Sequence, residues 1–211
     1  MTLDEKKEAL IETEWEDFQK VHNEGGRASC QDDRETFFIQ RKCRLITWPE
    51  ALVESWHEDL KEADAAGRNL LSEKYAWMMR HTAPEEFKEL RKYLQFPSMF
   101  TELKIEEVVK VQVAWMEEYK EKYPYMAAGN RAIHSSEDSP YETSFETYLR
   151  GELYTYSEKT VNLYLEMIHK LQEDGKNMSL IIMDATAKAY GYKDLQMAED
   201  QQKIRAGRQG Q

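Results

Sequence analysis

Between Gly25 and Asp33 the chain reads Gly-Gly-Arg-Ala-Ser-Cys-Gln-Asp-Asp, and a helical pattern of apolar residues lies on each side of this stretch. Before it, apolar residues recur three and four positions apart, at Leu10, Ile11, Trp15 and Phe18. After it, Asp32 and Glu35 have the spacing of a capping box at the start of a helix. Because glycine commonly ends a helix and a capping aspartate starts one, the stretch predicts two helices joined by a tight connection.

The same succession of apolar helical segments with start and stop residues continues along the whole chain. Starts are expected at Thr47, Thr82, Thr143, Ser157 and Asp194, and stops at Gly67, Gly175 and Gly191. We expect an all-α fold, a compact multi-helix bundle of about ten helices with no significant sheet. Residues 1–211 are expected to form a single all-helical domain, and its polar C-terminal tail, about 200–211, is expected to fray. The segment from Leu180 to Tyr190 is apolar on most sides, which predicts the most buried helix.

The composition limits the classes of partner. The chain has 211 residues, 41% of them hydrophobic and 33% charged, with a formal net charge of -11 at pH 7. This charge disfavours nucleic acid and anionic membranes, and the densest basic run, Arg41, Lys42 and Arg44, is short. No apolar run approaches the roughly 18 residues of a membrane-spanning helix, and the polar N-terminus does not resemble a signal peptide. We therefore expect a cytoplasmic protein that binds neither nucleic acid nor membranes, and for which a small anionic ligand remains a candidate.

The connection between the first two helices carries more chemistry than a turn requires. It places Arg27, Cys30 and Gln31 beside two carboxylates, Asp32 and Asp33. The dipole of the following helix favours the thiolate form of Cys30, whereas the neighbouring carboxylates oppose it. Cys30 is therefore either a nucleophile or a small buried apolar side chain. The other four residues form either a ligand-binding network or an internal lattice of ion pairs that fixes the loop.

A second polar block follows the longest irregular connection, which carries Arg131. Glu146 and Arg150 are four residues apart, the spacing of an ordinary helical ion pair. Gly151 is unusual inside a helix, where glycine costs about 1 kcal/mol relative to alanine. It indicates close approach by a neighbour, either another helix or a ligand, which Arg150 and Glu152 would then line.

Two Glu-x-x-His pairs, Glu54 with His57 and Glu166 with His169, have the spacing found in di-iron helical bundles. The helical periodicity places Glu54, Glu166 and His169 away from the apolar faces of their helices. We therefore predict no metal site, and the sequence identifies no cofactor.

The first polar block resembles the signature of a bacterial family catalogued as domain of unknown function 4125, on the residues Gly25 to Asp33, Thr36, Phe37, Arg41 and Trp48. Further blocks that resemble this family are Gly67 to Tyr75, Thr143 to Glu152 and Gly191-Tyr192. The resemblance covers nearly the whole chain. It implies where the family unit begins and ends, and it implies no activity.

Two hypotheses of function follow from these residues. In the first, the chain is an enzyme or a binder that acts on a small polar or anionic metabolite in a pocket between the two polar blocks. Its catalytic candidates are Cys30, Asp32, Asp33, Glu146 and Glu152, and its substrate-binding candidates are Arg27, Gln31, Arg41, Arg131 and Arg150.

In the second hypothesis, the chain is a helical interaction or regulatory module without catalytic activity. Its exposed aromatic residues, such as Trp48, Trp77 and Trp115, would then form one contiguous patch. A protein partner or a homo-oligomer is compatible with either hypothesis.

Overall fold

The computed structural model describes residues 1–22, 26–139 and 142–209. These residues form eleven α-helices and four short 3-10 helices, with no strand among them. The α-helices are α1 (Leu3–Gln19), α2 (Arg34–Arg44), α3 (Glu50–Ala65), α4 (Leu70–Thr82), α5 (Pro84–Leu90), α6 (Met99–Lys122), α7 (Pro124–Ala127), α8 (Phe145–Leu153), α9 (Glu158–Glu173), α10 (Met178–Ala189) and α11 (Leu195–Gln209). The 3-10 helices are η1 (Ser29–Gln31), η2 (Leu45–Thr47), η3 (Arg91–Tyr93) and η4 (Ser135–Glu137). The predicted all-α class is confirmed.

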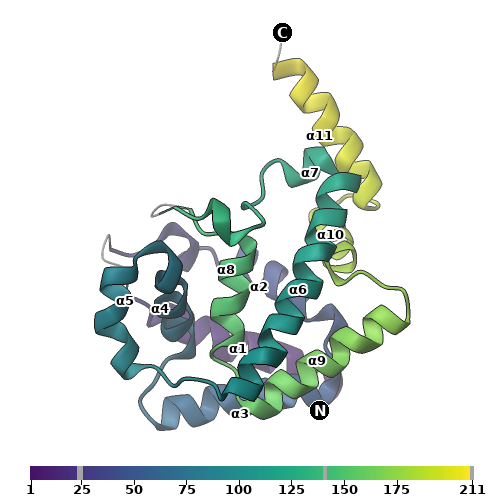
Figure 1. Ribbon diagram of the computed structural model, residues 1–211. Coiled ribbons are helices and arrows are strands. Elements are labelled where there is room, and N and C mark those ends of the chain that lie inside the picture. Colours follow the sequence, from purple (N-terminus) through teal and green to yellow (C-terminus); the bar gives the residue numbers. More distant parts are fainter. Residues whose placement is uncertain (23–25, 140–141, 210–211) are drawn as a thin grey trace.

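The long helix α6 packs against α7, α8, α9 and α10 (Figure 1). α1 and α3 cross the base of the molecule, and α4 and α5 lie on one side of it (Figure 1). α8 packs against α4 and α6, whereas α10 packs against α2 and α6. α11 contacts α7 and α10 and projects away from the body (Figure 1). In this arrangement α2, α4, α8 and α10 surround the centre of the molecule.

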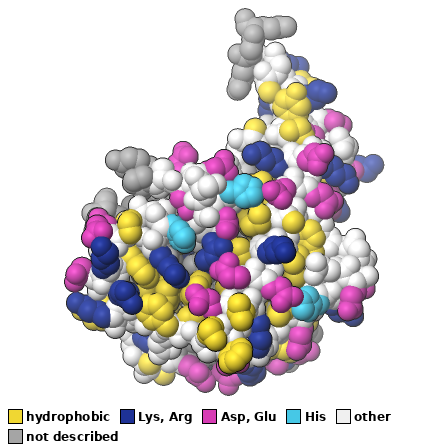
Figure 2. Space-filling model, in the orientation of Figure 1, with side chains coloured by type: hydrophobic (Ala, Val, Ile, Leu, Met, Phe, Trp, Pro, Cys, Tyr) yellow, Lys and Arg dark blue, Asp and Glu magenta, His cyan; other side chains and the backbone are white. Residues whose placement is uncertain are grey.

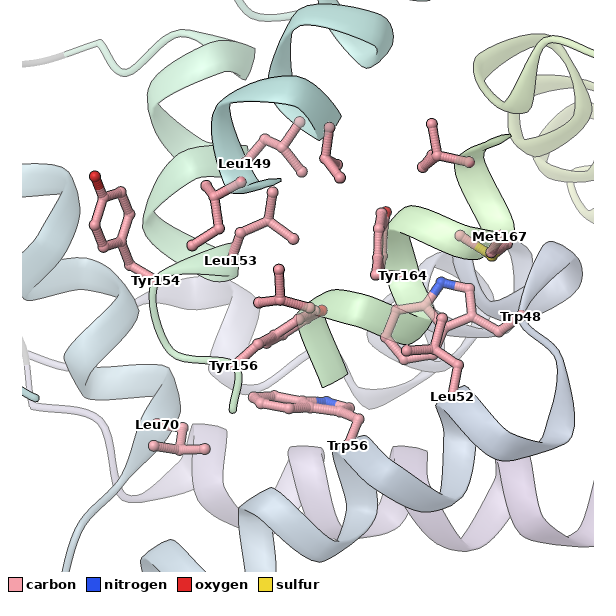
Figure 3. Close-up of a cluster of buried hydrophobic side chains, with 14 of the residues drawn as sticks. Trp48, Leu52, Trp56, Leu70, Leu149, Leu153, Tyr154, Tyr156, Tyr164 and Met167 are labelled. Atoms are coloured by element: carbon pink, nitrogen blue, oxygen red, sulfur yellow. The ribbon is translucent and has the colours of Figure 1, made fainter. Parts of the chain in front are cut away.

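The main hydrophobic core contains residues of α3, α8 and α9 together with aromatic side chains from the connections between helices (Figure 3). The ring of Trp48 meets that of Tyr164 edge-on, with centroids 5.6 Å apart and an interplanar angle of 90°. The ring of Trp56 packs on Tyr156 with centroids 4.4 Å apart. Such aromatic pairs add to the stabilisation that comes from burial of their apolar area.

A second, smaller hydrophobic cluster lies at the C-terminal end of α6 and includes Met116, Tyr119, Ala127, Ile133, Ala187, Leu195 and Ala198. α6 therefore contributes to both clusters, with Ile105 and Val108 in the first and Met116 in the second. Between these positions lies the buried Gln112, whose amide donates a hydrogen bond to Oη of Tyr164 at 3.0 Å. A polar residue thus separates the two apolar stretches of one helix.

The observed helix starts correct some of the predicted ones. The N-cap of α2 is Asp33 and not Asp32, and its carboxylate accepts a backbone N–H of the first turn at 3.0 Å. The N-cap of α8 is Ser144 and not Thr143. In each case two neighbouring residues offer a suitable acceptor, and only the backbone path selects between them. The predicted stop at Gly67 is confirmed, since α3 ends at Ala65 and Gly67 has a φ of 71°, which favours glycine.

The prediction that Leu180 to Tyr190 is the most buried helix is wrong. In α10 only Met178, Ser179 and Ala187 are buried, and residues 180–186 are half-buried. Part of its apolar surface faces the cavity described below. The tail expected to fray is helical through Gln209. Among the described residues, no helix combines the length and the apolar composition needed to cross a membrane.

Candidate functional site

A cavity of about 630 Å³ is lined by residues of α2, α4, α8 and α10, with contributions from α1, α6 and the loop 129–131. Its volume lies within the roughly 300–1,000 Å³ that is usual for small-molecule sites. The lining joins segments far apart in the sequence, such as α2 and α8. The fold therefore lines one cavity with residues from both halves of the chain.

Much of the cavity wall is apolar. The apolar residues that line it include Phe18, Phe37, Leu70, Leu71, Met116, Phe145, Met178, Ile182 and Met183. The rings of Phe18 and Phe37 stack with centroids 5.4 Å apart, which joins α1 to α2 at this wall. An apolar wall of this kind gives affinity for the hydrocarbon part of a ligand.

Arg41 and Glu14 form a buried ion pair at one side of the cavity. Nε of Arg41 donates to Oε2 of Glu14 at 2.7 Å, and its Nη2 donates to Oε1. The indole N–H of Trp56 also donates to Oε1 of Glu14, at 2.8 Å. Burial opposes the charge of Arg41, but the carboxylates of Glu14 and Glu152 outweigh it and raise the pKa of the guanidinium. Arg41 therefore has its main polar partner inside the protein.

Glu152 is the buried carboxylate of α8, and three cations lie around it. Its Oε1 lies 3.1 Å from Nη2 of Arg44 and 3.9 Å from Nη1 of Arg41, and its Oε2 lies 3.8 Å from Nζ of Lys74. The hydroxyl of Tyr156 donates to Oε1 at 3.0 Å. Burial would raise the pKa of Glu152, but Arg44, Lys74 and Arg41 together hold it at about 2. Glu152 is thus ionised at neutral pH.

Tyr148 lies among the cations of the cavity. Nζ of Lys74 donates a hydrogen bond to its Oη at 2.7 Å. Nζ of Lys74 lies 4.2 Å from the centroid of its ring, Cζ of Arg131 lies 5.0 Å from it, and Cζ of Arg44 lies 5.9 Å from it. Burial would raise the pKa of Tyr148, but Lys74 and Arg44 lower it below its usual value. The environment of this phenol therefore favours negative charge.

The charged side chains that line the described cavity are four cations (Arg41, Arg44, Lys74, Arg131) and three carboxylates (Glu14, Asp33, Glu152). Their sum is positive by one charge, although the whole chain carries -11. On the face drawn in Figure 2, acidic and basic side chains are interspersed rather than gathered into a patch of one sign. The cavity is thus locally cationic within an acidic protein, which favours an anion.

Gly151 allows the helices that carry these groups to approach each other. A Cβ added to Gly151 would lie 2.9 Å from Cγ of Met78 and 3.0 Å from the carbonyl oxygen of Lys74. The predicted close neighbour of this glycine is therefore confirmed, and it is the helix α4. This contact places Lys74 of α4 beside Tyr148 and Glu152 of α8.

The structure divides the candidate residues proposed from the sequence into two groups. Cys30, Asp33, Arg41, Arg131 and Glu152 line the cavity. Cys30 is exposed, so it is not the buried apolar side chain considered above. Gly25 lies outside the described residues.

The remaining candidates do not line the cavity, and their side chains contact other groups of the protein. Arg27 donates to the carboxylate of Asp32 and to the backbone carbonyl of Gln31, both at 2.7 Å. The amide of Gln31 in turn donates to the carbonyl oxygens of Phe18, at 2.9 Å, and Val21, at 3.0 Å. These contacts match the internal lattice that fixes the loop.

Arg150 and Glu146 also form a structural pair. Arg150 donates twice to Glu106 of α6, at 2.8 and 2.9 Å, and once to Glu146 at 2.9 Å. Oε2 of Glu146 accepts the backbone N–H of Ser135 at 2.7 Å. Burial would raise the pKa of Glu146, but these hydrogen bonds lower it. The pair joins α8 to α6 and to the preceding loop.

Sequence reasoning missed five charged or phenolic groups of the cavity, Glu14, Arg44, Lys74, Tyr75 and Tyr148. A signal for two of them was present. Glu14 lies four residues from both Leu10 and Phe18, and Lys74 lies four residues from Leu70. A charged residue within an apolar helical stripe must find a buried partner, so each predicts a buried ion pair.

The two Glu-x-x-His pairs contact other residues. Nζ of Lys6 forms an ion pair with Glu54, and Nε2 of His169 lies 2.7 Å from Oε1 of Glu107. Across residues 1–22, 26–139 and 142–209, no three His, Cys, Asp or Glu side chains are grouped so that they could hold a metal ion.

Comparison with known proteins identifies the family. A family model described as "Protein of unknown function (DUF4125)" matches residues 5–200. No curated protein and no solved structure matches the chain. Because the model covers most of the 211 residues, the chain belongs to the DUF4125 family of proteins of unknown function.

Proposed function

We propose that this protein binds a small organic anion in the central cavity. The anionic group lies near Arg44, Lys74 and Arg131, and the hydrocarbon part lies against the apolar wall. The observation that carries this proposal is the gathering of these three cations around Tyr148 in a cavity whose remaining wall is largely apolar. A guanidinium or ammonium group in such surroundings binds a carboxylate or phosphate more strongly than it would in open water.

Hydrogen-bond donors in the cavity support the proposal. Arg44 contacts Glu152 through one of its terminal nitrogens, Nη2. Arg131 donates to the carbonyl oxygen of Thr143 at 3.1 Å through Nη1. A guanidinium carries five N–H donors, so each of these arginines has further donors for a ligand.

The cavity also offers an acceptor. Oε2 of Glu152 is buried and accepts no hydrogen bond from the described residues. A buried carboxylate oxygen without a donor is costly, and a hydroxyl or amide N–H on a ligand would remove that cost. The favoured ligand is therefore an organic acid that also carries a hydrogen-bond donor.

Benzoate tests the proposal, because it combines a carboxylate with a compact apolar body. Isothermal titration calorimetry is expected to show tighter binding of benzoate than of benzamide, which has the same shape and N–H donors but no charge. Arg131→Gln is expected to weaken benzoate binding about tenfold, the usual effect of losing one charge-assisted contact. Arg131 is exposed, so this variant is expected to fold normally.

Arg34→Gln is the matched control, since Arg34 is an exposed arginine at the start of α2 that does not line the cavity. It is expected to bind benzoate as the wild type does. Equal affinity for benzoate and benzamide, or equal loss of affinity in both arginine variants, contradicts the proposal.

Two of the three tryptophans named for the interaction-module hypothesis are buried. Trp48 is 1% exposed and Trp77 is 3% exposed, so neither can belong to a surface patch. Large apolar side chains are instead exposed between Tyr93 and Leu103, around the start of α6. In Figure 2 hydrophobic side chains gather on the side of the molecule that carries α4 and α5. The cavity provides the more specific chemistry and therefore the favoured function.

A further inference from the structure

The hydroxyl of Tyr148 has a geometry that differs from that of an ordinary buried phenol. It accepts a hydrogen bond from Nζ of Lys74 at 2.7 Å. No described residue accepts a hydrogen bond from it, although the side chain lines the cavity. Its proton is therefore available to a molecule in the cavity and is not committed to the protein.

Charged groups from each neighbouring element act on this phenol. α4 provides Lys74 together with the phenol of Tyr75, α2 provides Arg44, and the loop 129–131 provides Arg131. On α8 itself, the negative charge of Glu152 raises the pKa of Tyr148, but contacts with Arg44 and Lys74 offset this charge. Cations outnumber the carboxylate in this set, so the phenolate form is stabilised.

We propose that Tyr148 is the acid–base residue of the cavity, and that it exchanges a proton with the organic anion bound beside it. Lys74 is the positioning residue, because its ammonium group holds the phenol oxygen and stabilises its negative charge. This inference rests on the proposed function and extends it from binding to catalysis. The site is then an active site for proton transfer on an organic acid.

The proposed step moves one proton and no electrons. The phenolate oxygen of Tyr148 takes a proton from an acidic C–H or O–H group of the ligand. The electron pair of that bond stays on the ligand as an enolate or alkoxide, next to the guanidinium of Arg44. Tyr148 becomes a neutral phenol, and it returns the proton in the reverse step. A phenolate removes a C–H proton readily only next to a carbonyl group, so the substrate class is a carboxylic acid with a neighbouring carbonyl or hydroxyl group.

Absorbance at the tyrosinate band during a pH titration tests the state of Tyr148. The wild type is expected to show one tyrosine that ionises below the main transition, and Tyr148→Phe is expected to lose it. Lys74→Met is expected to raise the midpoint of this tyrosine by about one pH unit or more. Should Lys74→Met fail to fold, Arg131→Gln, at an exposed position, is expected to raise the same midpoint by a smaller amount. Tyr93→Phe, which removes a tyrosine that is 71% exposed, is the matched control and is expected to keep the early transition.

Calorimetry with benzoate tests whether the same phenol faces the ligand. Benzoate beside a phenolate favours protonation of that phenolate, so binding is expected to take up protons in a pH range around the Tyr148 midpoint. The uptake is measured from binding heats in two buffers of different ionisation enthalpy. Tyr148→Phe is expected to abolish this proton uptake, whatever its affinity for benzoate.

The two experiments separate failure of the inference from failure of the proposed function. If benzoate does not bind but the early tyrosine transition is present, the proposed function fails. The inference that Tyr148 ionises at a lower pH than the other tyrosines is then still supported. If benzoate binds but Tyr148→Phe leaves the titration curve and the proton uptake unchanged, the inference is overturned while binding stands.

Discussion

Gly151 of α8 lies directly against Met78 of α4, so that a Cβ on Gly151 would come within 2.9 Å of Cγ of Met78. The same Cβ would lie 3.0 Å from the backbone carbonyl oxygen of Lys74. The Met78 side chain can rotate away, but the backbone at Lys74 cannot do so without moving α4. The distance between Lys74 and Tyr148 in the cavity therefore depends on the absence of a side chain at Gly151.

Gly151→Ala is expected to destabilise the protein by roughly 1–3 kcal/mol, the usual cost of overpacking. The substitution improves helix propensity, so a net loss would come from the contact with α4. Urea unfolding measures the change in the free energy of unfolding. The substitution is also expected to weaken benzoate binding, because it separates the helices that carry Lys74 and Tyr148.

Gly207→Ala is the matched control for this prediction. Gly207 is also inside a helix, α11, and a Cβ added there would meet nothing within 4 Å. It is expected to leave stability unchanged or to raise it by up to about 1 kcal/mol. If the two alanine variants have the same stability, the close contact at Gly151 does not limit the packing of α8.

Glu152→Gln is expected to lower the free energy of unfolding at pH 7 by roughly 3–5 kcal/mol, because it leaves three buried or half-buried cations without their shared carboxylate. The pKa of Glu152 is about 2 in the folded protein, whereas its ordinary value is 4.5. The carboxylate therefore stabilises the fold fully above pH 4.5, and this contribution is lost as the pH falls from 4.5 toward 2.

Urea unfolding of the wild type and of Glu152→Gln between pH 7 and pH 3 measures this dependence. The difference in the free energy of unfolding between them is expected to shrink as the pH falls. Protonation removes the negative charge of Glu152 in the wild type, and the glutamine of the variant never carries it. Glu85→Gln, at an exposed carboxylate paired with Lys88, is expected to change stability by no more than about 0.5 kcal/mol. A difference between the wild type and Glu152→Gln that is constant across this pH range contradicts the prediction.

The fold class could be predicted from the sequence because helical periodicity and helix ends are local properties. The stop at Gly67 and the start at Ser157 follow from the residues themselves. The burial of α10 could not be predicted in the same way. A helix that is apolar on most sides can face either a core or a cavity, and the choice depends on how distant helices pack.

Prediction of the candidate site from the sequence is limited in the same way, because the site depends on how distant helices pack. Cys30, Asp33 and Arg41 are close in sequence, so this segment alone predicts part of the cavity wall. Lys74 and Tyr148 come from two different helices, α4 and α8, which approach each other closely at Gly151. Arg27 and Arg150 have the residue types of a binding site, yet their partners are other side chains and backbone groups of the protein. Residue type alone does not distinguish a ligand contact from an internal ion pair.

Ile182→Trp is expected to fill part of the cavity. Ile182 is a half-buried residue of α10 that lines the cavity, so the larger ring can enter space that is already open. Benzoate binding is expected to fall at least about tenfold, while the melting temperature stays the same or rises, because the added ring buries apolar surface. Ile204→Trp on α11, where Ile204 is 56% exposed, is the control and is expected to bind benzoate normally. Normal benzoate binding by Ile182→Trp would place the ligand elsewhere.

Cys30 and Cys43 are expected to differ in reactivity, because Cys30 is exposed at the cavity whereas Cys43 is buried. A colorimetric disulfide reagent is expected to modify one thiol per chain in the native protein and two in denaturant. Cys30→Ser is expected to remove the native reaction and to bind benzoate like the wild type, because the cations that hold the anion are unchanged. The bulky aromatic adduct on Cys30, in contrast, is expected to reduce benzoate binding by narrowing the cavity, and reduction of the adduct is expected to restore it. Full binding by the modified protein would show that the ligand does not pass or contact this wall of the cavity.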